Sequence, residues 1–160
     1  SVPGRSVVSI EPETAGRLAR DCDNILSIKE AGGDPGRVDL LKAALPEGFP
    51  ILCGDDPLTL EFMKRGAVGS VSVSSNIIPT AMSYLVRAMN AGDLGRAEAI
   101  HAEYAPLLDS LMGIDTNPVP IKAAVALMGM CEQEIRLPLV SLSAANMEAV
   151  RELLEKFKLA

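Results

Sequence analysis

The 160-residue chain is poor in aromatic and basic residues, and both shortages exclude classes of partner. Aromatic side chains make up 3% of the residues, too few for the stacking platforms of proteins that bind single-stranded nucleic acids. A formal net charge of −6 leaves no excess of positive charge for phosphate groups or anionic lipid headgroups. We therefore expect neither a nucleic-acid nor a membrane partner.

Metal-ligating and redox residues are also scarce. The three cysteines, Cys22, Cys53 and Cys131, are odd in number and far apart, which fits neither a disulfide framework nor a zinc site. The single histidine, His101, cannot form half of a histidine-rich metal site. No apolar run reaches the ~18 residues of a membrane helix, and no signal-peptide pattern is present. These features predict a cytoplasmic protein with reduced thiols and without a metal or cofactor.

Residues 1–91 alternate between strand-like and helix-like periodicities. Short apolar runs at 25–29, 49–53 and 69–73 predict buried strands. Apolar residues at helical spacing predict helices at 12–20, 35–45, 57–65 and 77–91, the third of them capped by Asp56 with Pro57 in its first turn. Strands that alternate with helices predict βα units, a parallel sheet and the α/β fold class.

From Gly92 onward the pattern is helical throughout. It predicts helices at 93–113, at 118–129 and from a cap at Ser143 to about residue 158. Three parallel strands cannot close a barrel, and a (β/α)₈ barrel takes about 250 residues. The chain is therefore either a small open sheet or part of a larger structure.

Lys29 is the first candidate for chemistry, because it follows the apolar run of a predicted strand. In α/β folds the carboxyl ends of parallel strands hold the active sites, and a lysine shielded from water there can attack a carbonyl to form a Schiff base. The alternative is a strand-end lysine that extends into solvent. Alternation along the strand predicts that Ile28 and Glu30 face the helices, while Ser27 and Lys29 face the other side.

Three further segments carry weaker signals. Arg5 lies either in an exposed turn or where its guanidinium can bind a substrate carboxylate. Gly54, Asp55 and Asp56 form a turn with a helix cap, where glycine allows a ligand to approach the backbone and two carboxylates alone are weak support for a cation. The glycine-rich segment 32–36 lacks the spacing of a phosphate-binding loop, which favours a plain connection.

Taken together, these segments resemble the dihydrodipicolinate synthase family, in its order and at its spacing, over nearly the whole chain. The matching segments are Val2-Pro3-Gly4-Arg5, Ile28-Lys29-Glu30-Ala31, Gly54-Asp55-Asp56 and the three runs at 69–76, 117–122 and 136–139.

The resemblance implies the second half of a (β/α)₈ TIM barrel, with about three parallel strands in residues 1–91, and a C-terminal three-helix domain in residues 92–160. It implies a class I aldolase-type lyase that acts in lysine and diaminopimelate biosynthesis, as a homotetramer or a dimer. Pyruvate would form a Schiff base on Lys29 and condense with aspartate semialdehyde. Arg5 matches the arginine that meets the semialdehyde carboxylate, and Gly54 and Val71 match positions that line the pyruvate pocket.

The sequence also departs from the family pattern. The family's proton-shuttling tyrosine would fall just before Ser1, and its pyruvate-carboxylate loop belongs to the half of the barrel that this chain lacks. We therefore expect the isolated chain to be inactive and poorly stable without a complementing N-terminal half. Three alternatives remain: an N-acetylneuraminate lyase-like pyruvate aldolase, a non-catalytic fragment for assembly, or a small-molecule binding module with an open sheet.

Overall fold

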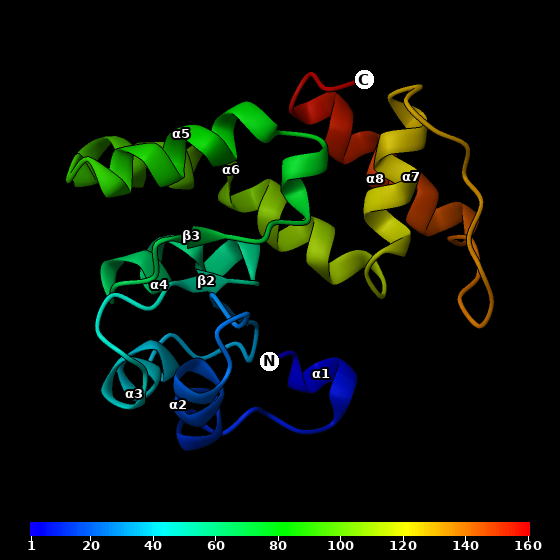
Figure 1. Ribbon diagram of the computed structural model, residues 1–160. Helices are drawn as coiled ribbons and strands as arrows, with labels where there is room; N and C mark the ends of the chain where they lie inside the picture. Colours follow the sequence, from blue (N-terminus) through cyan, green and yellow to red (C-terminus); the bar gives the residue numbers. More distant parts are fainter. The chain divides into compact units, whose positions relative to one another are not determined.

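The computed structural model describes residues 1–160, in which three short parallel strands alternate with helices before a purely helical stretch (Figure 1). The strands are β1 (Ile28–Glu30), β2 (Ile51–Cys53) and β3 (Gly69–Ser70), and they form one sheet in the order β1-β2-β3. The helices are α1 (Pro3–Ser6), α2 (Pro12–Asp21), α3 (Arg37–Ala44), α4 (Thr59–Lys64), α5 (Pro79–Asn90), α6 (Leu94–Ile114), α7 (Val119–Leu127) and α8 (Ala144–Lys156).

The chain divides into two compact units. The first unit comprises Ser1–Ser72 and Tyr84–Glu98, and the second comprises Val73–Ser83 and Ala99–Ala160. Helices α5 and α6 therefore each contribute residues to both units. The sequence-based division at residue 92 stays a prediction.

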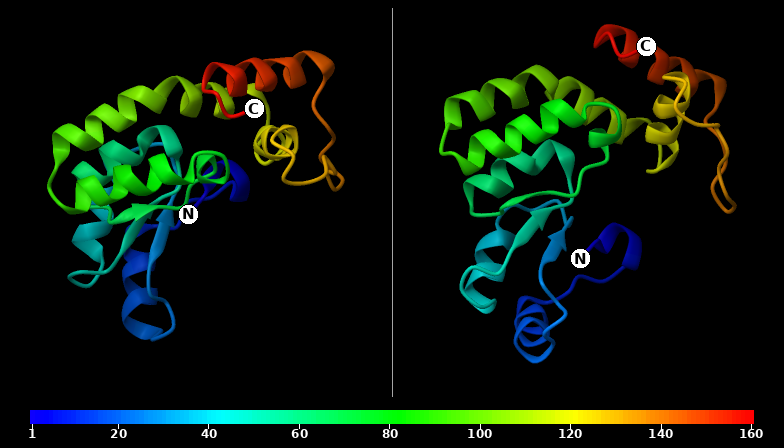
Figure 2. Two further views of the ribbon diagram at one scale, coloured as in Figure 1. Left: turned by 90° about the horizontal axis from the view of Figure 1, so that it is seen from above. Right: turned by 45° about the horizontal axis from the view of Figure 1, so that its top comes forward.

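The first unit is built on the sheet, whose strands lie side by side and run in the same direction (Figure 2). Helix α2 packs against α3. The two backbones approach closely at Gly16, where a Cβ would overlap the Ala44 carbonyl oxygen. Helix α4 packs against β2 and β3, and its Phe62 is fully buried. Burial of such a side chain contributes about 1.5–3 kcal/mol, so these apolar contacts hold the helices against the sheet.

The second unit is a helical cluster around a continuous apolar core. Helix α7 packs against α8, and the rings of Tyr104 and Phe157 stack with their centroids 5.9 Å apart. The most deeply buried members of this core are Leu107, Leu108, Leu111, Ala124, Val150 and Leu154. No helix in the chain is long and apolar enough to span a membrane.

The strands are shorter than the apolar runs predict, and β1 is shifted toward its carboxyl end. Its predicted start at Ile25 is wrong, since the Ile25 N–H donates to the Cys22 carbonyl in a turn. Lys29 is consequently the central residue of β1 and Glu30 is its last. The third strand ends at Ser70, although the Val71 N–H still donates to the Cys53 carbonyl, and a 3₁₀ turn, η2 (Ser74–Asn76), follows.

Two local features at helix starts also differ from the prediction. Asp56 is not the N-cap residue of α4, which is Leu58: Asp56 is buried and begins a 3₁₀ turn, η1 (Asp56–Leu58), which precedes α4. Helix α1 was not predicted, because it is a single turn of four residues and buries none of them, so it leaves no apolar periodicity in the sequence.

The predicted cap at Ser143 is confirmed, since its side-chain oxygen accepts a hydrogen bond from the Asn146 N–H at 3.1 Å. Loss of such a cap leaves an unpaired N–H in the first turn of α8 and costs about 1 kcal/mol. We expect Ser143→Ala to lower the free energy of unfolding in urea by that amount. Ser141→Ala, an exposed serine two residues earlier, is the control. Equal losses from the two changes would contradict the capping role.

Candidate functional site

Parallel pairing brings three of the four predicted site residues to one face of the sheet. Lys29 pairs with Leu52, which pairs with Gly69. Two positions further along each strand come Ala31, Gly54 and Val71, where the Gly54 N–H donates to Glu30 and the Val71 N–H donates to Cys53. Because side chains alternate, all of these positions share one face. Lys29, Gly54 and Val71 therefore meet at the carboxyl end of the sheet.

Gly54 lies directly against the side chain of Lys29. A Cβ at this position would overlap the Lys29 Cε, and would stand 2.7 Å from the Ala31 Cβ and 3.0 Å from the Lys29 Cγ. The absence of a side chain at Gly54 thus makes room for the lysine stem. The predicted close approach at this glycine is to Lys29 itself, a contact that the sequence did not indicate.

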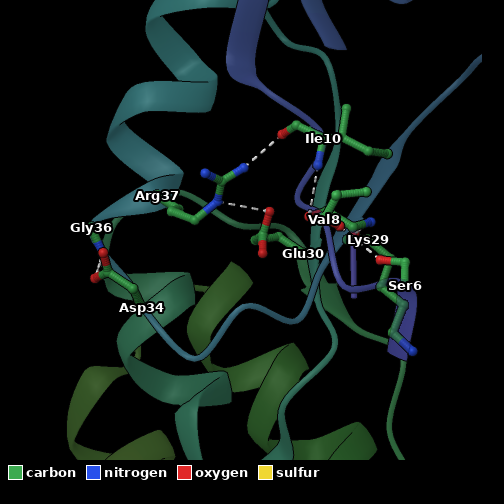
Figure 3. A network of polar contacts seen from close by, with 9 residues as sticks. Ser6, Val8, Ile10, Lys29, Glu30, Asp34, Gly36 and Arg37 are labelled. Atoms are coloured by element: carbon green, nitrogen blue, oxygen red, sulfur yellow. Dashed lines mark hydrogen bonds and ion pairs between the residues drawn. The ribbon is translucent and has the colours of Figure 1, made fainter. Parts of the chain in front are cut away.

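The opposite face carries a buried ion pair, shown in Figure 3. The Glu30 carboxylate is fully buried and accepts a hydrogen bond from Arg37 Nε at 3.1 Å. Arg37 begins α3, and its Nη2 also donates to the Ile10 carbonyl at 2.7 Å. Ile28 and Glu30 are buried and Lys29 is half-buried, as alternation predicts. The carboxylate next to the lysine is therefore paired with an arginine on the other side of the sheet.

Arg5 reaches the carboxyl end of the sheet by another route. The Ser1 nitrogen donates to the Lys29 carbonyl at 2.7 Å, and the Ala31 N–H donates to the Ser1 carbonyl at 2.9 Å. This is the pattern of a parallel strand pair on the outer edge of β1. The chain therefore leaves Ser1 at the carboxyl end of β1, where helix α1 presents Arg5 with an exposed side chain.

A buried thiol, Cys53, ends β2, and two acidic residues, Asp55 and Asp56, follow it. Burial raises the pKa of the Cys53 thiol to about 11, although its hydrogen bond to the Asp55 carbonyl at 3.1 Å acts in the opposite direction. Partial burial, reinforced by the charge of Asp56, raises the pKa of the Asp55 carboxyl. A thiol so protonated is a poor nucleophile, which leaves Lys29 as the stronger candidate at this end of the sheet.

A cavity of about 260 Å³ borders Lys29 along the outer edge of β1. Its lining is mainly apolar, and Ser1 and Ser27 are its polar members besides the lysine. The apolar lining residues are Ile10, Ala15, Leu18, Ile25, Ile28, Leu45 and Phe49.

Arg37 was missed by sequence reasoning. Its contact with Ile10 joins residues 27 positions apart, and no periodicity reports a contact of that range. The only local signal is the spacing of Glu30 and Arg37, which places opposite charges at the end of a strand and the start of the next helix.

Parallel strands that alternate with helices, with a lysine and a close glycine at the carboxyl end, have the arrangement of part of a (β/α)₈-barrel enzyme. The chain belongs to the dihydrodipicolinate synthetase family, whose model matches residues 1–157. It is 41% identical over 159 residues to the 4-hydroxy-tetrahydrodipicolinate synthase of Aquifex aeolicus. The match covers 99% of this chain and 54% of that relative.

Solved structures agree with this assignment. The crystal structure of the Aquifex aeolicus dihydrodipicolinate synthase superposes with a TM-score of 0.95, over 99% of this chain and 54% of that one. The synthase of Methylacidiphilum fumariolicum SolV, which is 46% identical, superposes with a TM-score of 0.93 over 99% of this chain and 52% of that one. The Acinetobacter baumannii enzyme, determined in complex with pyruvate and 37% identical, gives 0.92 over 100% and 54%. The chain thus spans about half the length of these relatives, and its predicted place in the second half of the barrel stays a prediction.

The fit between Gly54 and Lys29 predicts a large effect of one methyl group. Gly54→Ala should lower the free energy of unfolding by about 1–3 kcal/mol, because the new Cβ forces Lys29 and Ala31 to move. Gly95→Ala in α6 is the matched control, since a Cβ there meets nothing within 4 Å. Denaturant unfolding of both variants checks the difference. A Gly54→Ala variant as stable as the Gly95→Ala variant would rule out the close contact.

Proposed function

We propose that this chain carries the nucleophile of a Schiff-base-forming lyase that condenses pyruvate with aspartate semialdehyde. The observation that carries the proposal is the position of Lys29, half-buried on the face it shares with Gly54 and Val71 at the carboxyl end of a parallel sheet. Membership of the dihydrodipicolinate synthetase family supports this assignment of the substrates. The reaction belongs to lysine and diaminopimelate biosynthesis.

In the proposed mechanism the neutral Lys29 Nζ attacks the ketone carbon of pyruvate, and loss of water gives an imine. The protonated imine withdraws electrons, so the neighbouring methyl group loses a proton and an enamine forms. Its carbon then attacks the aldehyde carbon of the semialdehyde, and hydrolysis frees the amine. Gly54 and Val71 border the bound pyruvate, where the absence of a side chain at Gly54 keeps the amine accessible.

Arg5 is proposed to bind the carboxylate of the semialdehyde. Its guanidinium is exposed on α1 at the same end of the sheet as Lys29. A planar fork of donors can hold a carboxylate through two parallel hydrogen bonds, which would orient the aldehyde toward the enamine.

A complete site needs more of the barrel than this chain supplies. Three strands leave two outer edges, and only Ser1 pairs with the outer edge of β1. We propose that the remaining strands come from the part of the family fold that the chain does not cover, and that residues 92–160 form a three-helix domain beside the barrel. Assembly as a homotetramer or dimer in the cytoplasm is part of the same proposal. One solved relative, at a TM-score of 0.90, is described as a monomeric variant.

A non-catalytic role in assembly is the second candidate. The observation that favours it is the incomplete sheet, since three strands cannot enclose an active site. An N-acetylneuraminate lyase-like aldolase is less favoured, because the matching relatives cited above are dihydrodipicolinate synthases.

Borohydride trapping tests the nucleophile directly. The chain is purified with the part of the Aquifex aeolicus relative that it does not cover, then mixed with pyruvate and borohydride. We expect an adduct on the peptide that contains Lys29 and none in Lys29→Arg, because a guanidinium does not form the imine. Lys64→Arg is the control, as Lys64 is a surface lysine paired with Glu61 and Glu98.

Trapping also separates the two candidate functions. Retention of the adduct in Lys29→Arg would contradict the Schiff-base role. Absence of any adduct from the folded, assembled protein would favour the assembly role. The chain without its complement is expected to show no turnover.

Substitution of Arg5 tests the second substrate. Arg5→Ala should raise the KM for aspartate semialdehyde about ten- to a hundredfold, the cost of losing hydrogen bonds to a charged group. Imine formation with pyruvate should be unchanged. Arg17→Ala, which removes an exposed arginine of α2, should change neither the KM for the semialdehyde nor imine formation. A loss confined to pyruvate binding would contradict the assignment of Arg5.

A further inference from the structure

The segment Ser1–Ile10, which carries Arg5, contains no fully buried residue. Helix α1 buries none of its residues, and Val7 and Val8 are 90% and 68% exposed. Val7 also has a φ of 69°, which is unfavourable for a β-branched residue. Apolar burial therefore contributes little to the position of α1, which leaves the polar contacts at the two ends of the segment to hold it.

Both ends are tied to the same place in the fold. At the first end, the main chain of Ser1 pairs with Lys29 and Ala31 on the edge of β1. At the other end, Arg37 Nη2 donates to the Ile10 carbonyl at 2.7 Å. The Ile10 N–H also donates to the Ser1 Oγ at 3.4 Å, so the two ends of the segment meet.

Arg37 can hold Ile10 because Glu30 holds Arg37. The Glu30 carboxylate is 0% exposed and the Arg37 side chain is 16% exposed, so the arginine is largely withdrawn from water. Gly32 leaves room for the carboxylate, since a Cβ there would stand 2.6 Å from Glu30 Oε1. A buried ion pair contributes little net stability after the cost of its desolvation, but it fixes the direction of a guanidinium.

We propose that Arg37, oriented by Glu30, is a positioning residue that anchors the segment Ser1–Ile10 and so holds Arg5 at the same end of the sheet as Lys29. Glu30 follows Lys29 on β1 and points to the opposite face. One strand thus positions the nucleophile on one face and the anchor for the carboxylate-binding arginine on the other. The consequence for catalysis rests on the function proposed above, whereas the anchoring itself does not.

Arg37→Lys separates the two contacts of the arginine. The lysine ammonium ends one bond short of the Nη2 position, so it can pair with Glu30 while it loses the fork that reaches Ile10. Arg65→Lys is the matched control, since Arg65 forms an exposed ion pair with Asp39 and does not contact the segment. If Arg37→Lys fails to fold, the double variant Glu30→Gln with Arg37→Gln removes both buried charges and is measured in the same way.

Hydrogen exchange of the chain, assembled with its complement as in the trapping experiment, tests the anchoring without any reference to activity. The amides of Arg5, Ser6 and Val7 are hydrogen-bonded within the segment to Val2 and Pro3. We expect the peptide covering residues 1–10 to exchange about tenfold faster in Arg37→Lys, the effect of one lost hydrogen bond to a charged group, and to be unchanged in Arg65→Lys. Unchanged exchange in Arg37→Lys would overturn the proposal.

Kinetics of the assembled protein test the consequence for the substrate. Arg37→Lys should raise the KM for the semialdehyde about tenfold while pyruvate trapping on Lys29 keeps its rate. An equal loss of both would indicate general disruption and overturn the positioning role, as would faster exchange with an unchanged KM. If the unsubstituted protein traps no pyruvate, the proposed function fails, and the anchoring is then decided by hydrogen exchange alone.

Discussion

The parallel register of β1, β2 and β3 is the constraint on which the candidate site depends. A shift of one residue in β1 would turn Lys29 toward the helices and Glu30 toward the open face. The register holds because Ile28 and Ile51 are buried on the helix side, and because Val38, Leu41 and Phe62 complete the core of the same unit. Apolar burial, which is non-directional, thus fixes the direction of a polar side chain on the other face.

The same register explains how two charges on adjacent residues are kept apart. Glu30 lies on the buried side, where an unpaired carboxylate would be costly, and Arg37 at the start of α3 compensates it. The ion pair of Glu30 is therefore with Arg37 and not with Lys29, its neighbour in the chain. Lys29 and Glu30 lie on opposite faces of β1, and the following helix supplies Arg37 as the partner of Glu30. A lysine and a glutamate can therefore be neighbours in the chain without pairing with each other.

Sequence patterns predicted the parts of this arrangement that repeat along the chain. Alternation placed Ile28 and Glu30 against the helices, and helical periodicity located α2, α3 and α5 to α8 closely. The ends of the strands were less predictable, because Ile25 and Leu26 have the propensity for a strand but pair with nothing in the sheet. Propensity is a property of the residue, whereas a strand exists only where a partner lies beside it.

Contacts that join distant residues were beyond sequence reasoning. Gly54 was predicted as a close approach to a ligand, yet the side chain that it accommodates belongs to Lys29, 25 residues earlier in the chain. Arg37 and Ile10 meet through one guanidinium and one carbonyl, and neither residue type is unusual at its position. Helix α1 lies between the hydrogen-bonded residues Ser1 and Ile10, and its own four residues form no amphipathic pattern.

The half-buried state of Lys29 and the 43% exposure of Val71 bear on what chemistry the chain can perform. The proposed imine formation needs a lysine side chain that a carbonyl compound can reach, and Lys29 lies on the face where Gly54 has no side chain. Enamine addition makes a stricter demand, because the reactive carbon must be kept from water and protons until the second substrate arrives. A face that is open over Lys29, Gly54 and Val71 suits imine formation better than it protects the enamine. In the proposed function, carbon–carbon bond formation is therefore the step that depends on the rest of the barrel, while the direction of the Lys29 side chain is already set within these three strands.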